Sequence, residues 1–124
     1  MKCSVGIDIV SIARIEDMAN RHGERFYNRI YTLQEIEYCT SKKGKFLHLA
    51  ARFAAKEAFV KAVGTGFRFG IAWKDIEVSH NNFGKPFLQL HGKALEQANN
   101  QNFNHFEISL THDRTFAAAI VIAL

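Results

Sequence analysis

The sequence predicts an α+β fold, a single domain over residues 1–124 in which helices pack on an antiparallel sheet. Three observations support this prediction. The length of 124 residues fits one domain, and a hydrophobic fraction of 48% is enough to build its core. Apolar residues recur at helical spacing through most of the first half of the chain. In the second half they alternate as they do in strands.

The first half is predicted to form one strand followed by helices. Residues 2–10 alternate between an apolar face (Val5, Ile7, Ile9) and a face that carries Gly6, Asp8 and Val10. Helix starts are marked by caps, because Ser11 precedes helical spacing and Thr32 to Glu35 is a capping box. Gly64 ends the longest helix. The predicted helices cover residues 12–21, 24–30, 32–41 and 46–63, with a basic loop at 42–45.

The second half is predicted to form two pairs of antiparallel strands. Turn residues at 81–86 join the first pair, and residues 112–115 join the second pair. The last strand is apolar on both faces, so we expect it to lie at the centre of the sheet and to be covered by helices. The predicted strands cover residues 73–79, 87–91, 106–111 and 116–123, with a loop at 64–70 and a modest helix at 92–100.

Charge and composition constrain the partners and the location. The formal net charge of +4 favours acidic partners, such as phosphates, an acidic protein or nucleic acid. The chain has no apolar run of about 18 residues, so no membrane-spanning helix is predicted. Asp8 interrupts the only early apolar run, which argues against a signal peptide. Cys3 and Cys39 lack metal or redox spacing, and we expect two buried thiols in a cytoplasmic chain.

Two carboxylates stand in unusual surroundings. Asp8 takes an inward-facing position in an apolar strand, and Glu57 lies within the alanine-rich segment 52–61. A carboxylate among apolar neighbours is costly unless it is paired, hydrogen-bonded or bound to a metal. Mg²⁺ typically takes one or two protein carboxylates and completes its shell with phosphate and water. Asp8 and Glu57 therefore predict a Mg²⁺ site that serves a phosphate.

Basic residues accompany Glu57 on the same predicted helix. Lys61 stands four residues after Glu57 on one helical face, and Arg52 and Lys56 form a second pair at that spacing. The helix thus offers one acid for a cation and two to three bases for phosphate oxygens. A solvated face with ordinary ion pairs would show the same spacing. Asp8, an acid at an inward-facing strand position, favours a metal and phosphate site over a solvated face.

Other features are weaker signals. The six histidines are scattered without ligand spacing, and only His112 ends a strand, where sites often gather; a turn contact with Asp113 is the alternative. The loop Gly64–Gly66 lacks the spacing of a nucleotide-binding motif. Basic residues near the first helix can dock an acidic protein or can form a solvated face. These residues are Arg14, Arg21, Arg25 and Arg29.

With these features in place, the chain resembles the holo-[acyl-carrier-protein] synthases, the short bacterial class of 4′-phosphopantetheinyl transferases. The matching segments run in family order over nearly the whole chain, and they are specific in combination although each is modest alone. They are Gly6–Val10, Arg52–Ala58 with Lys61 and Ala62, Gly64–Gly66, Trp73–Val78, Gly84–Pro86 and Ser109–Asp113.

The resemblance implies an activity. Such enzymes move the 4′-phosphopantetheine arm of coenzyme A onto a serine of apo-acyl carrier protein for fatty acid biosynthesis, and they release adenosine 3′,5′-bisphosphate. Asp8 and Glu57 would hold Mg²⁺ against the pyrophosphate, and Lys61 would neutralise the same oxygens or assist proton transfer. The residues implied in binding coenzyme A are Arg52, Lys61, Gly64, Thr65, Gly66 and His112, with Lys42, Lys43 and Lys45 as candidates for its 3′-phosphate.

The resemblance also implies partners. Arg14, Arg21 and Arg25 would meet the acidic recognition helix of the carrier protein. The short class is trimeric with active sites between subunits, so a homotrimer is expected, with His112 and Asp8 from different subunits. Neither nucleic acid nor a membrane is expected as a partner. Two other functions fit the residues alone: a phosphate- or nucleic-acid-binding module, although no RNA or DNA motif is present, and a Mg²⁺-dependent phosphohydrolase.

Overall fold

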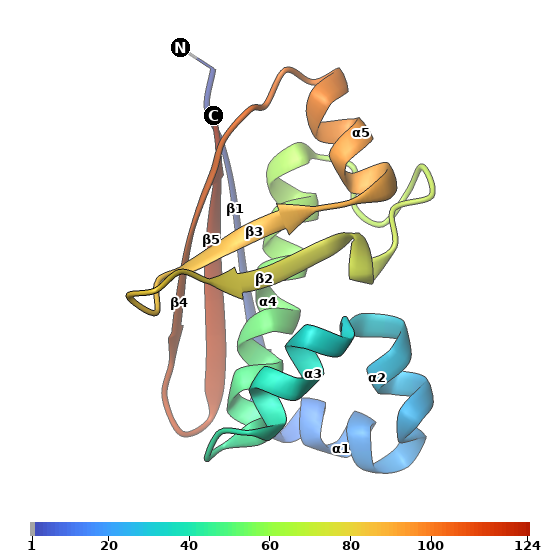
Figure 1. Ribbon diagram of the computed structural model, residues 1–124, viewed down its shortest axis with the longest axis vertical. Coiled ribbons are helices and arrows are strands. Elements are labelled where there is room, and N and C mark those ends of the chain that lie inside the picture. The colour runs from blue at the N-terminus through green and yellow to red at the C-terminus, as the bar shows by residue number, and fades with distance from the viewer. Residues whose placement is uncertain (1) are drawn as a thin grey trace.

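The computed structural model describes residues 2–124 and is built around one long helix. Helix α4 (Lys45–Val63) packs against strands β1 (Ser4–Ser11) and β5 (Phe116–Ala123), as Figure 1 shows. Both strands belong to a three-stranded antiparallel sheet in the order β1-β5-β4, in which β4 covers Phe106–His112. The last strand is therefore central, as predicted.

The other elements surround the rest of α4. A two-stranded antiparallel sheet of β2 (Ile76–His80) and β3 (Pro86–Leu90) crosses in front of α4 in Figure 1. Three helices gather at one end of the molecule, and α5 lies at the other end. They are α1 (Ile12–His22), α2 (Glu24–Ile30), α3 (Leu33–Thr40) and α5 (Gly92–Asn100). This arrangement confirms the predicted α+β class.

The helix boundaries follow from the caps that the sequence shows. The Ser11 side chain accepts a hydrogen bond of 3.2 Å from the Arg14 backbone N–H at the start of α1. Thr32 and Glu35 form the complete capping box before α3. Gly64 ends α4 in the left-handed conformation at φ 79°, which glycine adopts without steric cost.

A close contact between β1 and α4 positions the candidate site. A Cβ atom on Gly6 would lie 1.8 Å from the Ala58 carbonyl oxygen and 2.7 Å from the Ala62 backbone nitrogen. Glycine on the strand and alanine on the helix thus let the two backbones approach closely. Because side chains alternate along a strand, Asp8 lies on the same face as Gly6 and is directed toward α4.

Helix α4 covers β5, as expected for a central apolar strand, and the helices leave the opposite face of the sheet open. On the opposite face of β1, Val5, Ile7 and Ile9 are 55%, 64% and 65% exposed. Ile7 pairs with Ile120 of β5 in the register, so the apolar surface continues onto the neighbouring strand.

Two expectations of the sequence analysis are wrong. Residues Trp73–Asp75 form a single 3₁₀ turn, and β2 begins only at Ile76, because the Asp75 carboxylate accepts a hydrogen bond from the Ala72 backbone N–H and closes the turn. Cys3 is exposed, whereas Cys39 is buried as expected, and burial raises the pKa of its thiol to about 11. Within residues 2–124, no helix is both long and apolar enough to cross a bilayer.

Candidate active site

Asp8 and Lys61 meet where β1 crosses α4. The Lys61 ammonium lies 3.0 Å from Asp8 Oδ1, and it also donates a hydrogen bond of 3.0 Å to the Ile7 carbonyl. The Asp8 side chain is 17% exposed, whereas the Lys61 side chain is 52% exposed. The ammonium therefore pairs with a sheltered carboxylate while its outer side stays open to solvent.

Glu57 lies one helical turn before Lys61 on α4 and is half-buried. Burial raises the pKa of the Glu57 carboxyl, and the negative charge of Asp8 raises it further, whereas Lys61 and Arg14 act in the opposite direction. The two carboxylates are thus close enough to repel one another. A cation between them would relieve this repulsion.

The donor set fits Mg²⁺ better than a metal that needs a complete protein cage. Among residues 2–124, no group of three or more histidine, cysteine, aspartate and glutamate side chains is placed to hold a metal ion. Asp8 and Glu57 offer two hard oxygen donors, and Mg²⁺ commonly binds one or two carboxylates together with substrate phosphate and water. The exposed Lys61 adds positive charge for the same phosphate.

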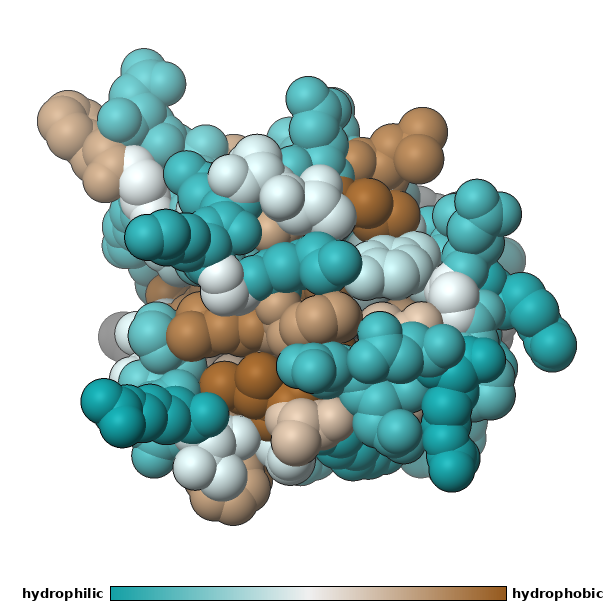
Figure 2. All heavy atoms as spheres, turned by 90° about the horizontal axis from the view of Figure 1, so that it is seen from below, coloured by the Kyte–Doolittle hydropathy of each residue, from teal (hydrophilic) through white to brown (hydrophobic). Residues whose placement is uncertain are grey.

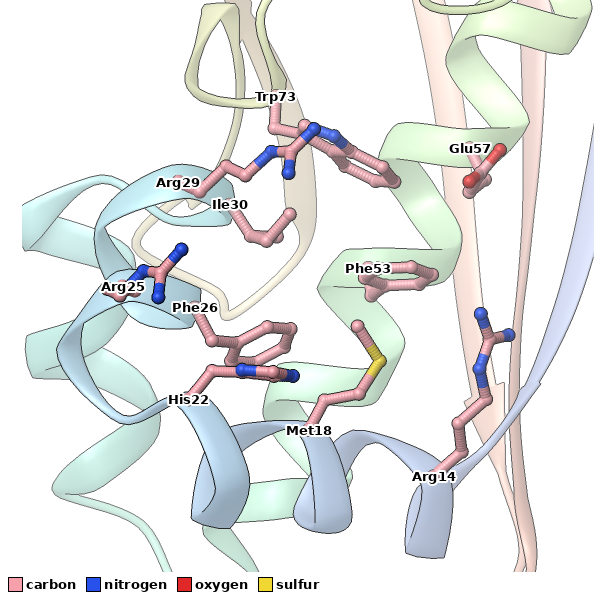
Figure 3. Close-up of a pocket in the computed structure, with 10 residues that line it drawn as sticks. All are labelled: Arg14, Met18, His22, Arg25, Phe26, Arg29, Ile30, Phe53, Glu57 and Trp73. Carbon is pink, nitrogen blue, oxygen red and sulfur yellow. The ribbon is translucent and has the colours of Figure 1, made fainter.

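Glu57 opens onto a cavity of about 430 Å³ between α1, α2 and α4. Figure 3 shows an apolar floor and basic side chains around it, with Arg14 directed toward the side of α4 that carries Phe53 and Glu57. The Arg14 guanidinium lies 5.9 Å from the centre of the Phe53 ring. The lining residues are Arg14, Met18, His22, Arg25, Phe26, Arg29, Ile30, Phe53, Glu57 and Trp73. We call this hollow the glutamate cavity.

The structure brings part of the predicted basic strip to the glutamate cavity. Arg14, Arg25 and Arg29 line it, whereas Arg21 does not. Arg21 is instead exposed and pairs with Asp17 one helical turn earlier, at 3.5 Å. Seen from the end of the molecule that carries the first three helices, apolar surface lies between hydrophilic side chains (Figure 2). This combination suits a partner that presents both acidic and apolar side chains.

A second cavity, of about 320 Å³, lies on the other side of α4 and is lined by both Arg52 and His112. We call it the histidine cavity. Two further histidines line it, His48 from α4 and His80 from β2. Local spacing does not indicate this grouping, because residues so far apart in the chain meet only through the packing of β2 and β4 near α4. The remaining lining residues are Tyr38, Leu47, Ala51, Lys85, Pro86, Ile108, Ser109 and Leu110.

Lys56 does not serve as a phosphate-binding base, which corrects the prediction for the second basic pair. Its ammonium is fully buried, 2.7 Å from Glu35 Oε1, and it donates to the carbonyls of Ile30 and Trp73 at 2.8 and 3.2 Å. Arg52 is also buried, at 1% exposure, but its guanidinium reaches the histidine cavity. The two bases thus have different roles, one structural and one at a cavity.

The Gly64–Gly66 loop follows Lys61 but lines neither cavity. The Thr65 hydroxyl is buried and donates a hydrogen bond of 2.8 Å to the Gly66 carbonyl. Lys42, Lys43 and Lys45 also lie outside both linings. His112 does not pair with Asp113, whose carboxylate accepts hydrogen bonds from the backbone of Thr115 and Phe116. The roles proposed for this loop and these lysines stay predictions.

Comparisons with known proteins agree with this architecture. The family described as the 4′-phosphopantetheinyl transferase superfamily matches residues 4–121. The holo-[acyl-carrier-protein] synthase of Halothermothrix orenii is 47% identical over 118 residues, which make up 95% of this chain and 94% of that protein. The crystal structure of the Neisseria meningitidis holo-[acyl-carrier-protein] synthase has a TM-score of 0.88 at 35% identity and covers 98% of this chain and 97% of that one. The Helicobacter pylori enzyme in complex with coenzyme A has a TM-score of 0.85 at 34% identity, with 97% and 99% covered.

The fold and these matches define the class of the protein, which is that of the 4′-phosphopantetheinyl transferases. Within this class the chain belongs to the holo-[acyl-carrier-protein] synthase family, because its relatives align over nearly their whole length. The resemblance that the sequence motifs indicated is confirmed.

Proposed function

We propose that this chain transfers the 4′-phosphopantetheine group of coenzyme A to a serine of apo-acyl carrier protein, and releases adenosine 3′,5′-bisphosphate. The observation that carries the proposal is the meeting of Asp8, Glu57 and Lys61 beside the glutamate cavity. Two carboxylates and an open ammonium suit the transfer of a highly charged phosphoryl group, which depends on positioning and charge neutralisation.

Asp8 and Glu57 are the residues that would hold Mg²⁺ in this proposal. When bound, the ion would stabilise negative charge on the phosphoryl group and on the departing phosphate. The Lys61 ammonium now contacts Asp8, but its side chain is exposed. It would turn partly away from Asp8 and contact the oxygens of the phosphoryl group. The mutual repulsion of Asp8 and Glu57 supports this assignment, because it favours a cation between them.

The acyl carrier protein would dock over α1 and α2. Arg14, Arg25 and Arg29 surround the apolar floor of the glutamate cavity, which supports docking of an acidic helix with an apolar face. Arg21 would contribute charge from the exposed side of α1, outside the cavity. The serine that accepts the phosphopantetheine would then approach Glu57 from the cavity.

Coenzyme A would extend between this centre and the histidine cavity. Arg52 and His112 would contact its nucleotide phosphates there, and Gly64, Thr65 and Gly66 would lie along its path. The basic lining of the histidine cavity supports the first assignment. The position of the loop at the end of α4, three residues after Lys61, supports the second.

We also propose that the active form is a homotrimer with sites between subunits. The uncovered face of the sheet, with Val5, Ile7 and Ile9 more than half exposed, supports association through β1 and β5. In such a trimer, Asp8 and His112 of one site would come from different subunits. A role in fatty acid biosynthesis and a cytoplasmic location stay predictions.

Intact-mass spectrometry of apo-acyl carrier protein tests the transfer. We expect a mass increase of one phosphopantetheine group after incubation with the chain, coenzyme A and Mg²⁺, and no increase with a chelator. A chain that is folded but modifies none of several carrier proteins would contradict the proposal. Hydrolysis of coenzyme A without any carrier protein would instead indicate a phosphohydrolase.

A further inference from the structure

The histidine cavity concentrates positive and titratable groups from several elements. His80 stacks on the ring of Tyr38, with ring centres 4.4 Å apart and an angle of 12° between the planes. His48 meets the same tyrosine edge-on at 5.9 Å. The Arg52 guanidinium lies 4.4 Å from the Tyr38 ring centre and places Nη2 3.4 Å from both ring nitrogens of His80. One compact group thus joins α3, α4 and β2.

Arg52 is held in this group without using all of its donors. Nη1 donates a hydrogen bond of 3.2 Å to the His48 carbonyl. The buried Nε has no hydrogen-bond partner within residues 2–124. A buried donor without a partner is costly, and native proteins rarely leave one unless a ligand or water completes it. Because Arg52 also lines the histidine cavity, an anion bound there can contact its guanidinium.

The charges that face the two histidines are almost all positive. Arg52 faces both from α4, Lys42 faces both from the loop after α3, and His112 faces His48 from the end of β4. Lys85, from the turn before β3, lines the cavity and pairs with Glu107 at 3.1 Å. In the described part of the chain, no carboxylate lines the cavity itself.

This environment disfavours the protonated form of both histidines in the free protein. Burial lowers the pKa of His48 and of His80, and the positive charge of Arg52 lowers both further. A neutral His80 ring can accept a hydrogen bond from Arg52 Nη2. A phosphate bound beside His48 and His80 would raise their pKa values, because its negative charge favours the protonated rings.

We propose that His48 and His80, together with Arg52, form a proton-coupled subsite for a phosphate monoester, in which each histidine can take up a proton from solvent as the phosphate binds. The inference rests on the proposed function for the identity of the ligand, which is then the 3′-phosphate of coenzyme A. It adds to Arg52 and His112 two binding residues and a pH dependence that the reaction itself does not require.

The geometry favours the monoester over the pyrophosphate of coenzyme A. The pyrophosphate must reach Asp8 and Glu57, whereas the histidine and glutamate cavities share no lining residue. A ligand with two separate phosphate groups can occupy both places, and coenzyme A has this chemistry.

The sign of the pH dependence follows from linkage. Groups whose pKa rises on binding take up protons, so the affinity for the phosphate increases as the pH falls through the range between the free and bound pKa values. The increase is at most about tenfold per pH unit for each proton taken up. Below about pH 6 the phosphate monoester itself becomes protonated, so the effect is read above that value.

Calorimetric titration with adenosine 3′,5′-bisphosphate at about pH 8 and pH 6.5 tests the proposal, with variants His48→Phe, His80→Phe and the double variant. Phenylalanine keeps the packing on Tyr38 but cannot bind a proton. We expect the unmodified protein to bind about tenfold more tightly at the lower pH by this linkage, and the double variant to lose most of that gain. His91→Gln, outside the cavity, is the matched control and should keep the gain.

Two further measurements show which phosphate binds at the subsite and which side chains take up the protons. Adenosine 5′-monophosphate should show little gain at low pH; an equal gain would overturn the assignment to the 3′-phosphate. Nuclear magnetic resonance titration should show the pKa values of His48 and His80 rising by about one unit or more in the complex, which corresponds to the expected change in affinity. Unchanged histidine pKa values, or an unaltered pH dependence in the double variant, would overturn the proposal.

The same experiment separates this inference from the proposed function. Transfer to the carrier protein with a flat pH dependence of nucleotide affinity would contradict only the proton-coupled subsite. Histidine pKa values that rise with adenosine 3′,5′-bisphosphate, in a protein that transfers no phosphopantetheine, would support the subsite and contradict the proposed function.

Discussion

The two carboxylates of the candidate site, Asp8 and Glu57, repel one another. Glu57 is half-buried and lies near the charge of Asp8, and both effects raise its pKa. Lys61 and Arg14 offset this only in part, since the Glu57 pKa stays raised. The folded chain thus holds an unfavourable negative charge at neutral pH, and a bound divalent cation would turn this cost into binding energy.

The first prediction concerns this charge. Replacing Glu57 with Gln removes one proposed ligand, and we expect transfer to fall by at least about a hundredfold, because a metal ion supplies several kcal/mol of charge stabilisation. Mg²⁺ should raise the melting temperature of the unmodified protein and leave that of the variant unchanged. Glu96→Gln, an exposed acid of α5, is the control for both measurements. An equal response to Mg²⁺ in both proteins would contradict the role of Glu57.

The surroundings of a residue could be predicted from the sequence only where local spacing determines them. Alternation along residues 2–10 correctly directed Asp8 to the inner face of β1. The same local reasoning failed for Lys56, because its partner Glu35 is 21 residues away and also serves as the acid of a capping box. His48 and His80 were interpreted as scattered for the same reason. Long-range packing, not spacing, brings such residues together.

Among the structural elements, β1 and α4 depend on each other most. Their backbones touch at Gly6, where no side chain fits. This contact determines how far Asp8 lies from Glu57 and Lys61, since the acid is on the strand and its neighbours are on the helix. The geometry of the candidate site is therefore set by the packing of two elements.

The second prediction tests this contact. Gly6→Ala would place a methyl group 1.8 Å from the Ala58 carbonyl oxygen, so strand and helix must separate. We expect the free energy of unfolding to fall by about 3 kcal/mol or more, at the upper end for an overpacked core. Denaturant unfolding at fixed protomer concentration measures the loss. The melting response to Mg²⁺ should also weaken; a stable variant with a normal response would show that the contact does not position Asp8.

A buried ion pair between Glu35 and Lys56 joins α3, α4 and β2. Glu35 of α3 accepts hydrogen bonds from Lys56 of α4 and from the Val78 backbone of β2. Lys56 in turn holds the carbonyls of Ile30 and Trp73, two residues of the glutamate cavity. Burial lowers the pKa of Lys56, and the charge of Glu35 opposes that change. The pair connects the cavity walls to the central helix.

The third prediction concerns this pair. Lys56→Met leaves the Glu35 carboxylate buried without its charge partner, and we expect a loss of about 3–5 kcal/mol in the free energy of unfolding. The double variant Lys56→Met with Glu35→Gln should be more stable than Lys56→Met alone, because the unpaired charge is then absent. Denaturant unfolding of both variants measures the difference. A double variant no more stable than the single one would show that charge pairing is not the cause.

Elements were predicted well where the chain carries caps and periodicity. The helix at residues 46–63 was expected within one residue of α4, because helical spacing and Gly64 define it. The strand expected from residue 73 was wrong at its start, because the hydrogen bond from Ala72 to the Asp75 carboxylate closes a turn there. The expectation for β5 was correct on its central place and on its cover by a helix, which is α4. The apolar pattern did not show that the second face of this strand stays partly exposed in one chain.

On the scale of the whole molecule, the uncovered sheet face is the main feature that one chain leaves unsatisfied. Val5, Ile7 and Ile9 are exposed beside Ile120 and Ile122 of β5, which are partly exposed. Fully burying one such side chain contributes about 1.5–3 kcal/mol. A surface of this kind favours association, and it is central to the proposed trimer.

The fourth prediction tests this surface. Ile7→Glu introduces a charge on the apolar face without touching the core that α4 covers. We expect analytical ultracentrifugation to give a trimer for the unmodified protein and a monomer for the variant, with transfer lost in parallel. Glu16→Gln, a change on exposed α1, should leave the trimer intact. An active monomer would contradict the proposal that sites form between subunits.

One feature of the glutamate cavity makes the protein its own optical probe. Trp73 is the only tryptophan of the chain, and it stacks on Phe67 and Phe53 at 3.9 and 4.8 Å between ring centres. It also lines the cavity beside Arg29 (Figure 3). All tryptophan emission therefore originates at the surface where the carrier protein is proposed to dock. Docking would change the solvent contact of a single indole, so its fluorescence reports occupancy of this cavity without any attached dye.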